Sequence, residues 1–177
     1  MSPLKSMVIL PFTLIASTFL LLGGCRTMHF DYPEPSAYDA NKGITVTVGE
    51  FKNDLGWSNP NRFKVNLYLD RPIDEAVRNA VIVELKRDGY KVGESPYEIS
   101  GVIESFVSAP DYTVIQYKVT DKKRQKVLYD KRVRADATVI GIFDEKGHVQ
   151  EVRQCILKFL NDPDFRGGFV PGTNSPR

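Results

Sequence analysis

The chain has 177 residues, of which 24 are Lys or Arg and 22 are Asp or Glu, so its formal net charge is +2 at pH 7. Charges this closely balanced exclude the basic footprint by which proteins bind nucleic acid, and we expect no nucleic-acid partner. Once an amino-terminal targeting segment is set aside, the length suits one compact domain with one core.

Residues 1–24 have the three zones of a secretory signal peptide. Lys5 supplies a positive charge, residues 7–22 form a nearly unbroken apolar stretch, and Gly23 and Gly24 are the small residues that a signal peptidase needs. A membrane-spanning helix is the alternative, but it needs about 20 apolar residues, more than this stretch contains. We therefore predict that residues 1–24 are removed as a signal peptide.

Cys25 follows directly, in the sequence Leu-Gly-Gly-Cys at residues 22–25. This pattern resembles the lipobox of bacterial lipoproteins, in which cleavage between Gly24 and Cys25 leaves the cysteine as an acylated amino terminus. The resemblance implies that Cys25 carries fatty chains such as palmitate, and two or more chains hold a protein firmly to a membrane. Ordinary secretion and a retained anchor are the alternatives.

Residue 26 is Arg. In enteric-type lipoproteins an Asp at this position tends to retain the protein in the inner membrane. The same resemblance therefore implies that this protein resides at the bacterial outer membrane, on the periplasmic face.

Residues 25–42 are predicted to be a lipidated tether that lifts the domain off the membrane. Pro33, Pro35 and the polar residues around them break any helical or strand period and favour extended chain. The aromatic residues of this segment could dock either on the lipid interface or on the domain. They are Phe30, Tyr32 and Tyr38.

The predicted domain covers residues 43–164 and begins with a strand at residues 44–48, where β-branched residues alternate. A polar loop follows at residues 52–62. Trp57 lies in its middle, and we interpret this tryptophan as either a lid over the core or an exposed contact residue. An alternating segment at residues 63–69 is a possible short second strand or extended segment.

The clearest helix of the chain is predicted between Asp70 and Gly89. Asp70 can cap its amino end, Pro72 suits the first turn, and Gly89 is a typical stop. Its apolar residues fall on one stripe at helical spacing, namely Ile73, Ala76, Val77, Ala80, Val81 and Leu85.

Three strands are predicted next, at residues 97–107, 112–120 and 126–140, joined by tight connections as an antiparallel meander with one wet face. Alternation puts Ile99 and Ile103 on one face of the first strand and Phe106 on the other. It also gives the second strand a polar side, which consists of Gln116, Lys118 and Thr120.

A second helix is predicted at residues 147–160, and Pro163 prevents its continuation. Its apolar stripe consists of Val149, Val152, Ile156, Phe159 and Leu160. Residues 165–177 are predicted to be a flexible carboxy-terminal tail, from which Phe165 or Phe169 could fold back.

These elements predict an α+β fold. Both helices have one apolar stripe and the meander has one wet face, so the economical packing lays both helices on the other face of one sheet. The result is a two-layer sandwich with a mostly antiparallel sheet of about four or five strands. The sequence leaves open which strand the segment at 44–48 joins.

No motif for catalysis or for binding a cofactor is present in the sequence. With Cys25 acylated, Cys155 has no disulfide partner, and its place in an amphipathic helix indicates a small buried hydrophobe. The carboxylates of Asp70, Asp74 and Glu75 fit the start of a helix better than a metal site. We expect no enzyme activity, no metal and no cofactor.

The layout of residues 43–164, together with the lipobox, resembles the YajG-like family of small bacterial outer-membrane lipoproteins. Its carriers are the strand Ile44-Thr45-Val46-Thr47-Val48, the helix closing in Leu85-Lys86-Arg87-Asp88-Gly89-Tyr90-Lys91-Val92, the meander, and the final helix ending in Phe159-Leu160-Asn161-Asp162. Accessory lipoproteins of lipid-transport systems and of cell-wall synthases look similar at this level. The family resemblance implies an envelope lipoprotein with no known catalysis, and it supplies no active-site residues.

Two functions follow as expectations. The first is a non-catalytic, lipid-anchored periplasmic module that binds an envelope protein, with possible contacts at Trp57, Lys118, Arg132 and Arg134. The alternative is an accessory lipoprotein of an envelope lipid-transport system, which requires an apolar cavity between helices and sheet. The cluster Lys122-Lys123-Arg124 is interpreted as a solvated hairpin tip, with contact to anionic lipid or a partner as the alternative.

Overall fold

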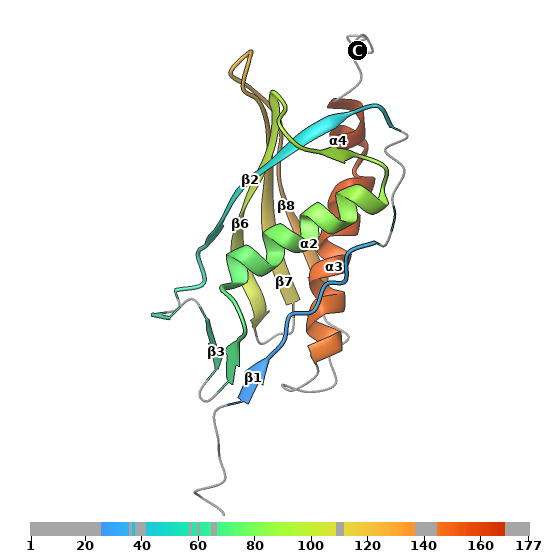
Figure 1. Cartoon of the computed structure of the whole chain (residues 1–177). Helices are drawn as coiled ribbons and strands as arrows, with labels where there is room; N and C mark the ends of the chain where they lie inside the picture. Colours follow the sequence, from blue (N-terminus) through green and yellow to red (C-terminus); the bar gives the residue numbers. More distant parts are fainter. Residues whose placement is uncertain are drawn as a thin grey trace, which may run out of the picture.

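The computed structural model describes residues 26–35, 37, 42–56, 58–59, 61–64, 67–108, 112–136 and 145–168. Its elements in chain order are β1 (Arg26–Met28), β2 (Thr45–Asn53), β3 (Arg62–Lys64), β4 (Leu67–Leu69), α2 (Ile73–Arg87), β5 (Lys91–Val92), β6 (Tyr97–Ser108), β7 (Tyr112–Asp121), β8 (Lys126–Asp136), α3 (Glu145–Asn161) and α4 (Pro163–Gly168). The fold is α+β in two layers, as predicted, with α2 and α3 on one face of a five-stranded sheet (Figure 1). None of the described helices is both long and apolar enough to cross a membrane.

The large sheet has the strand order β5-β2-β6-β7-β8. Strands β6, β7 and β8 are antiparallel neighbours, which confirms the predicted meander. Strand β2 joins this meander by running parallel to β6, with Thr47 opposite Glu98, and the short β5 pairs parallel with β2 at the edge. Parallel neighbours need a crossover connection, and α2 supplies it between β2 and β6.

A smaller sheet of order β1-β4-β3 lies at one end of the molecule, at the bottom of Figure 1. Strand β1 is parallel to β4, whereas β3 is antiparallel to it. The single extended segment expected at residues 63–69 is therefore divided between two strands. The two strands pair antiparallel with each other, and β4 pairs also with β1, a segment distant in the sequence.

Helix α2 buries the whole predicted apolar stripe. It begins at Ile73 with Pro72 in the N-cap position, and no side chain caps its amino end. The predicted cap by Asp70 is therefore wrong. The Asp70 carboxylate accepts a hydrogen bond from the Phe30 N–H at 3.2 Å instead, because the amino-terminal segment lies beside it.

Residues 26–35, which belong to the tether expected at residues 25–42, lie against the domain. Met28 and Phe30 are buried, and burial of such side chains is favoured because it removes apolar surface from water. The rings of Phe30 and Phe106 are 6.4 Å apart between centroids. Of the two docking surfaces open to Phe30 and Tyr32, the domain is the one observed, whereas Tyr38 lies outside the described residues.

Aromatic rings fill the core between the two layers. Tyr117 of β7 stacks on Phe159 of α3 with ring centroids 4.3 Å apart, and the Phe165 ring of α4 lies 4.2 Å from that of Phe159. Each such pair adds about 0.5–1.5 kcal/mol beyond the burial of its surface. Phe165 is buried, so the chain folds back onto the core after Pro163. The rest of the predicted tail, residues 169–177, lies outside the described residues.

Strand β6 changes which face its side chains present. Ile99 and Ile103 are buried as predicted, but Phe106 is buried as well, although strict alternation puts it on the wet face. The pairing with β7 shifts register between Ile103 and Ser105. A β-bulge of this kind inserts one residue and reverses the alternation beyond it. The predicted outward position of Phe106 is wrong for this reason.

Gly101 of β6 leaves room for the ring of Phe51. A Cβ at this position would lie 2.5 Å from Phe51 Cε1 and 2.7 Å from the carbonyl oxygen of Gln116. We expect Gly101→Ala to lower the free energy of unfolding by about 1–3 kcal/mol, the usual range for overpacking, as measured by urea denaturation followed by circular dichroism.

The matched control is Gly93→Ala, because a Cβ there meets only Thr45 Cγ2 at 3.9 Å. Its free energy of unfolding should stay within about 0.5 kcal/mol of the parent value. An equal loss in the two variants would contradict the packing argument.

Candidate functional site

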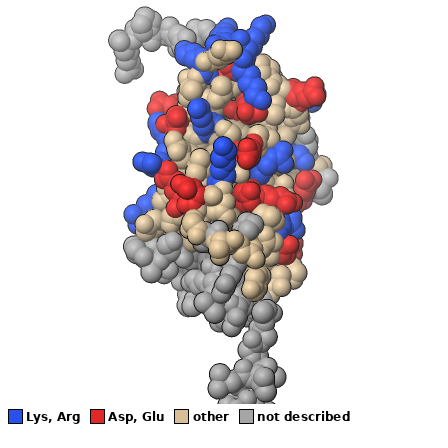
Figure 2. Space-filling view, turned by 90° about the vertical axis from the view of Figure 1, so that its left-hand side faces the viewer, with Lys and Arg blue, Asp and Glu red and all other residues tan. Residues whose placement is uncertain are grey.

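The face of the large sheet opposite the helices is the candidate functional surface, which we call the open face. Along β7 the side chains of Ile115, Tyr117 and Val119 are buried toward the helices, whereas Gln116 and Lys118 lie on the open face. The predicted division of this strand into an apolar and a polar side is therefore confirmed. In the side view of Figure 2, blue Lys and Arg side chains are interspersed with red Asp and Glu over most of the visible surface.

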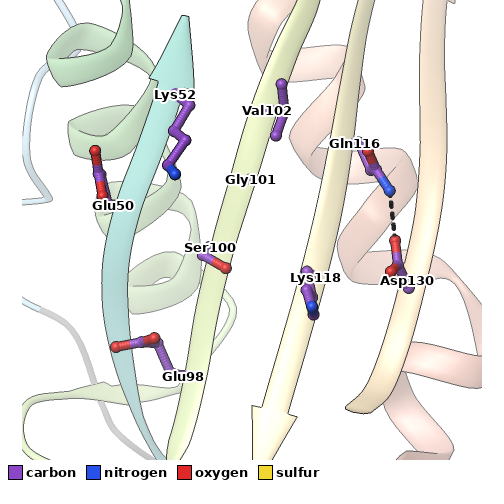
Figure 3. A pocket seen from close by; sticks show the side chains of 9 residues that line it. All are labelled: Glu50, Lys52, Glu98, Ser100, Gly101, Val102, Gln116, Lys118 and Asp130. Atoms are coloured by element: carbon purple, nitrogen blue, oxygen red, sulfur yellow. Dashed lines mark hydrogen bonds between the residues drawn. The ribbon is translucent and has the colours of Figure 1, made fainter.

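A hollow of about 400 Å³ lies on the open face, across strands β2, β6, β7 and β8. Figure 3 looks onto it with the helices behind the sheet. The charged and hydroxyl side chains that line it are Glu50, Lys52, Glu98, Ser100, Lys118 and Asp130. Because the sheet backbone forms the floor, these side chains are held at strand spacing, about 4.8 Å between neighbouring strands.

Some of the charged side chains in this hollow are paired with other residues of the domain, and others can bind a group from outside. The amide of Gln116 donates to Asp130 Oδ1 at 2.7 Å, and Lys122 pairs with Glu98 at the rim. Lys52 and Lys118 form no ion pair with any described residue. Their ammonium groups are therefore the ones that can meet a carboxylate from outside without breaking a bond within the domain.

The predicted contact residues differ in their surroundings. Lys118 lines the hollow. Arg132 lies on the same face but is bound to Glu104 at 2.8 Å, and Arg134 is bound to Asp136 at 2.8 Å. The guanidinium of Arg134 also lies over the Tyr112 ring, 4.2 Å from its centroid. The other predicted site residues are Gly24, Cys25 and Trp57, and they lie outside the described residues.

Sequence reasoning missed the contribution of β2 to this hollow. Glu50 and Lys52 come from the part of β2 beyond the predicted strand at residues 44–48. Alternation within β2 could have extended the strand, but no local pattern shows that β2 lies beside β6. The pairing itself is irregular, with a register shift between Val48 and Phe51.

Cys155 is buried in the core, as predicted. Its thiol lies 3.4 Å from the carbonyl oxygen of Thr113 and 3.7 Å from that of Val133. Burial raises the pKa of the Cys155 thiol to about 12, so the thiol stays protonated at neutral pH and is a poor nucleophile. In the described part of the chain, no group of three or more His, Cys, Asp or Glu side chains is arranged to hold a metal ion.

Comparison with known proteins finds similarity in structure only. No family model matches the chain, and no curated protein matches it. Protein XCC0632 from Xanthomonas campestris, of family DUF330, has a TM-score of 0.60 at 12% identity, covering 80% of this chain and 96% of its own. The hypothetical protein CT253 from Chlamydia trachomatis has a TM-score of 0.49 at 10% identity, covering 65% of this chain and 94% of its own. Lipoprotein GNA1162 from Neisseria meningitidis has a TM-score of 0.43 at 8% identity, covering 68% of this chain and 98% of its own.

The similarity to XCC0632 supports the two-layer fold and nothing beyond it, since the identity is 12%. The other two structures are too distant for an argument about this chain. None of the three points to the YajG-like family in particular, so that resemblance stays a prediction.

The raised pKa of Cys155 predicts an unreactive thiol. With a pKa of about 12, the thiolate is scarce at mildly alkaline pH, and burial denies the reagent access. Iodoacetamide should therefore leave Cys155 unmodified in the folded protein and alkylate it fully in urea, as read by peptide mass spectrometry. A Lys123→Cys variant, with its thiol on the exposed β7–β8 turn, should react readily when folded. Equal rates at the two positions would contradict the prediction.

Proposed function

We propose that this chain is a non-catalytic, lipid-anchored module of the bacterial cell envelope that docks an envelope protein on the open face of its sheet. The observation that carries the proposal is the hollow across β2, β6, β7 and β8, lined by charges of both signs. We infer an outer-membrane location, on the periplasmic side, from the lipobox at residues 22–25 and from Arg26.

The chemistry of the hollow favours a protein surface as the occupant. Pockets for small molecules are mostly apolar and enclose most of the ligand. This hollow is shallow, and Glu50, Lys52 and Lys118 stand at its surface. A pattern of alternating charge gives specificity toward a surface with the complementary pattern, because like charges brought together cost free energy.

The alternative, an accessory lipoprotein that carries lipid, requires apolar space between the helices and the sheet. In the described residues that space holds the packed rings of Phe51, Tyr117, Tyr129, Phe159 and Phe165. The packing weighs against a lipid-sized cavity there. Contact with a lipid-transport protein through the open face remains compatible with the proposal, because the partner would again be a protein.

Acylation is tested by metabolic labelling with palmitate in the native host. Cys25→Ser should abolish the label, because the hydroxyl does not accept the thioether-linked lipid. The matched control is Cys155→Ser, which removes the other cysteine of the chain and should keep the label. Persistent labelling of Cys25→Ser would contradict lipid attachment at this residue.

Docking on the open face is tested by a photo-crosslinking amino acid at Ser100, on the floor of the hollow. We expect a discrete adduct with an envelope protein, and we expect the double variant Lys52→Glu, Lys118→Glu to abolish it, because both free ammonium groups are reversed. The control Lys123→Glu, Lys126→Glu makes the same charge change on and beside the β7–β8 turn, outside the residues that line the hollow, and it should retain most of the adduct.

The circular dichroism melting curves of both double variants should match the parent curve, since all four lysines are exposed. An adduct that survives reversal of Lys52 and Lys118 would contradict docking in the hollow.

A further inference from the structure

Residues 26–35, which we call the strap, lie on the domain with the alternating burial of a strand. Met28 and Phe30 are buried, Tyr32 is half-buried, and the residues between them are exposed. The N–H of Asp70 donates to the carbonyl of Met28 at 3.0 Å, and the Asp70 carboxylate accepts from the N–H of Phe30 at 3.2 Å. The strap is therefore part of the folded domain.

The strap runs along helix α2 from its start to its last turn (Figure 1). Its contact with Asp70 lies just before the first residue of α2. Toward the other end of the helix, the Tyr32 hydroxyl donates to Glu84 Oε1 at 2.9 Å. The guanidinium of Arg87, the last residue of α2, donates to the carbonyl of Pro33 at 2.7 Å. The two ends of the strap therefore lie at opposite ends of α2.

The strap decides at which end of the domain a lipid anchor on Cys25 is attached. Cys25 is bonded to Arg26, so its Cα lies about 3.8 Å from that of the first residue of β1. With the strap docked, the attachment point is therefore the β1 end, beside the start of α2. With the strap released, the chain would join the domain at Lys42, whose N–H donates to the carbonyl of Gly89 at 3.2 Å, just beyond the other end of α2.

A released strap would also separate the domain from the bilayer. A free tether from residue 25 to residue 42 would average roughly 20–25 Å from end to end. The β7–β8 turn lies at the Lys42 end of the molecule, because the N–H of Lys122 donates to the carbonyl of Pro96 at 2.8 Å, shortly after β5 (Figure 1). The docked and released states thus differ in which end of the domain is nearer to the membrane.

The contacts of the strap favour the docked state. Burial of Met28 and Phe30 removes two large apolar side chains from water, and release would expose them again. Release would also take the Tyr32 hydroxyl away from the Glu84 carboxylate, which is 2% exposed. A buried carboxylate is stable only with its partners in place, so this loss opposes release.

We propose that the strap stays docked in the acylated protein and holds the domain with its β1 end toward the bilayer. The proposal rests on the acylation of Cys25 in the proposed function. Strand β7 has 10 residues and spans about 30 Å, so the β7–β8 turn at its far end is held away from the membrane. The envelope protein that docks on the open face then meets it within roughly this height of the bilayer.

The test uses the acylated full-length protein, purified from membranes and reconstituted into phosphatidylcholine vesicles with a nitroxide on the lipid headgroups. One variant, Glu75→Cys, carries a fluorophore on the first turn of α2, and another, Lys123→Cys, carries it on the β7–β8 turn; both positions are exposed. Cys155 is buried and should stay unlabelled. The nitroxide quenches fluorophores near the bilayer, so we expect several-fold stronger quenching at position 75 than at position 123.

The role of the strap is tested by releasing it in both labelled variants. Met28→Ser, Phe30→Ser removes the buried side chains and should abolish the difference between the two positions. The matched control, Thr27→Ser, Asp31→Ser, changes exposed residues of the strap and should keep the difference. Circular dichroism melting curves show whether each double variant is folded.

A spacer variant tests the same point without touching the domain. Ten Gly and Ser residues inserted directly after Cys25 leave every contact of the strap in place and add roughly 16–19 Å between anchor and domain. Quenching at position 75 should then fall several-fold. If the strap were already free, the spacer would lengthen an existing tether and change the quenching little. This variant decides the question if the loss of Met28 and Phe30 unfolds the domain.

The outcomes separate the docked strap from the anchor and from the docking of a partner. Equal quenching at positions 75 and 123 in vesicle-bound, acylated protein overturns the docked strap and leaves the lipid anchor and the open face standing. Stronger quenching at position 123 overturns it in favour of attachment through the Lys42 end. A mature amino terminus without acyl chains, read by mass spectrometry, overturns both the anchor and the orientation.

Discussion

The buried carboxylate of Glu84 is the interaction on which the arrangement of the helical layer depends. Glu84 of α2 is 2% exposed, and its Oε1 accepts hydrogen bonds from the Tyr32 hydroxyl at 2.9 Å and from Arg153 of α3 at 3.2 Å. Arg87 also pairs with it. A buried charge is tolerated only when it is paired, and removing a partner from such a group typically costs about 3–5 kcal/mol. One oxygen atom thus ties the segment of residues 26–35, α2 and α3 together.

The two layers of the domain differ in what covers them. The helical layer is covered in part by residues 26–35, which use Met28, Phe30 and Tyr32 to bind it. Burial and the neighbouring Glu84 raise the pKa of Tyr32, so its hydroxyl keeps the proton that it donates. The open face carries no described segment and presents charged side chains from four strands. In the proposed function, the open face meets the partner.

The candidate site shows which of its features can be predicted from the local sequence pattern and which cannot. Alternation along β7 was sufficient to place Lys118 on the open face, because neighbouring residues of a strand point to opposite sides. Sequence could not show that Arg132 is already bound to Glu104, since these residues meet across β7 after a bulge shifts the register of β6. Nor could it supply Glu50 and Lys52, whose place in the hollow depends on β2 pairing with β6.

The sequence by itself determined the two long helices, the three strands of the meander, and the apolar sides of α2 and β7. The stripe of α2 and the alternation of β7 are properties of consecutive residues, and they survive in the folded protein. Only the tertiary structure decided where β2 joins the sheet, why Phe106 is buried, and that Met28 and Phe30 lie on the domain. These features arise from contacts between segments far apart in the chain. The free energy of these contacts depends on both of the surfaces that pack together, and a short stretch of sequence contains only one of them.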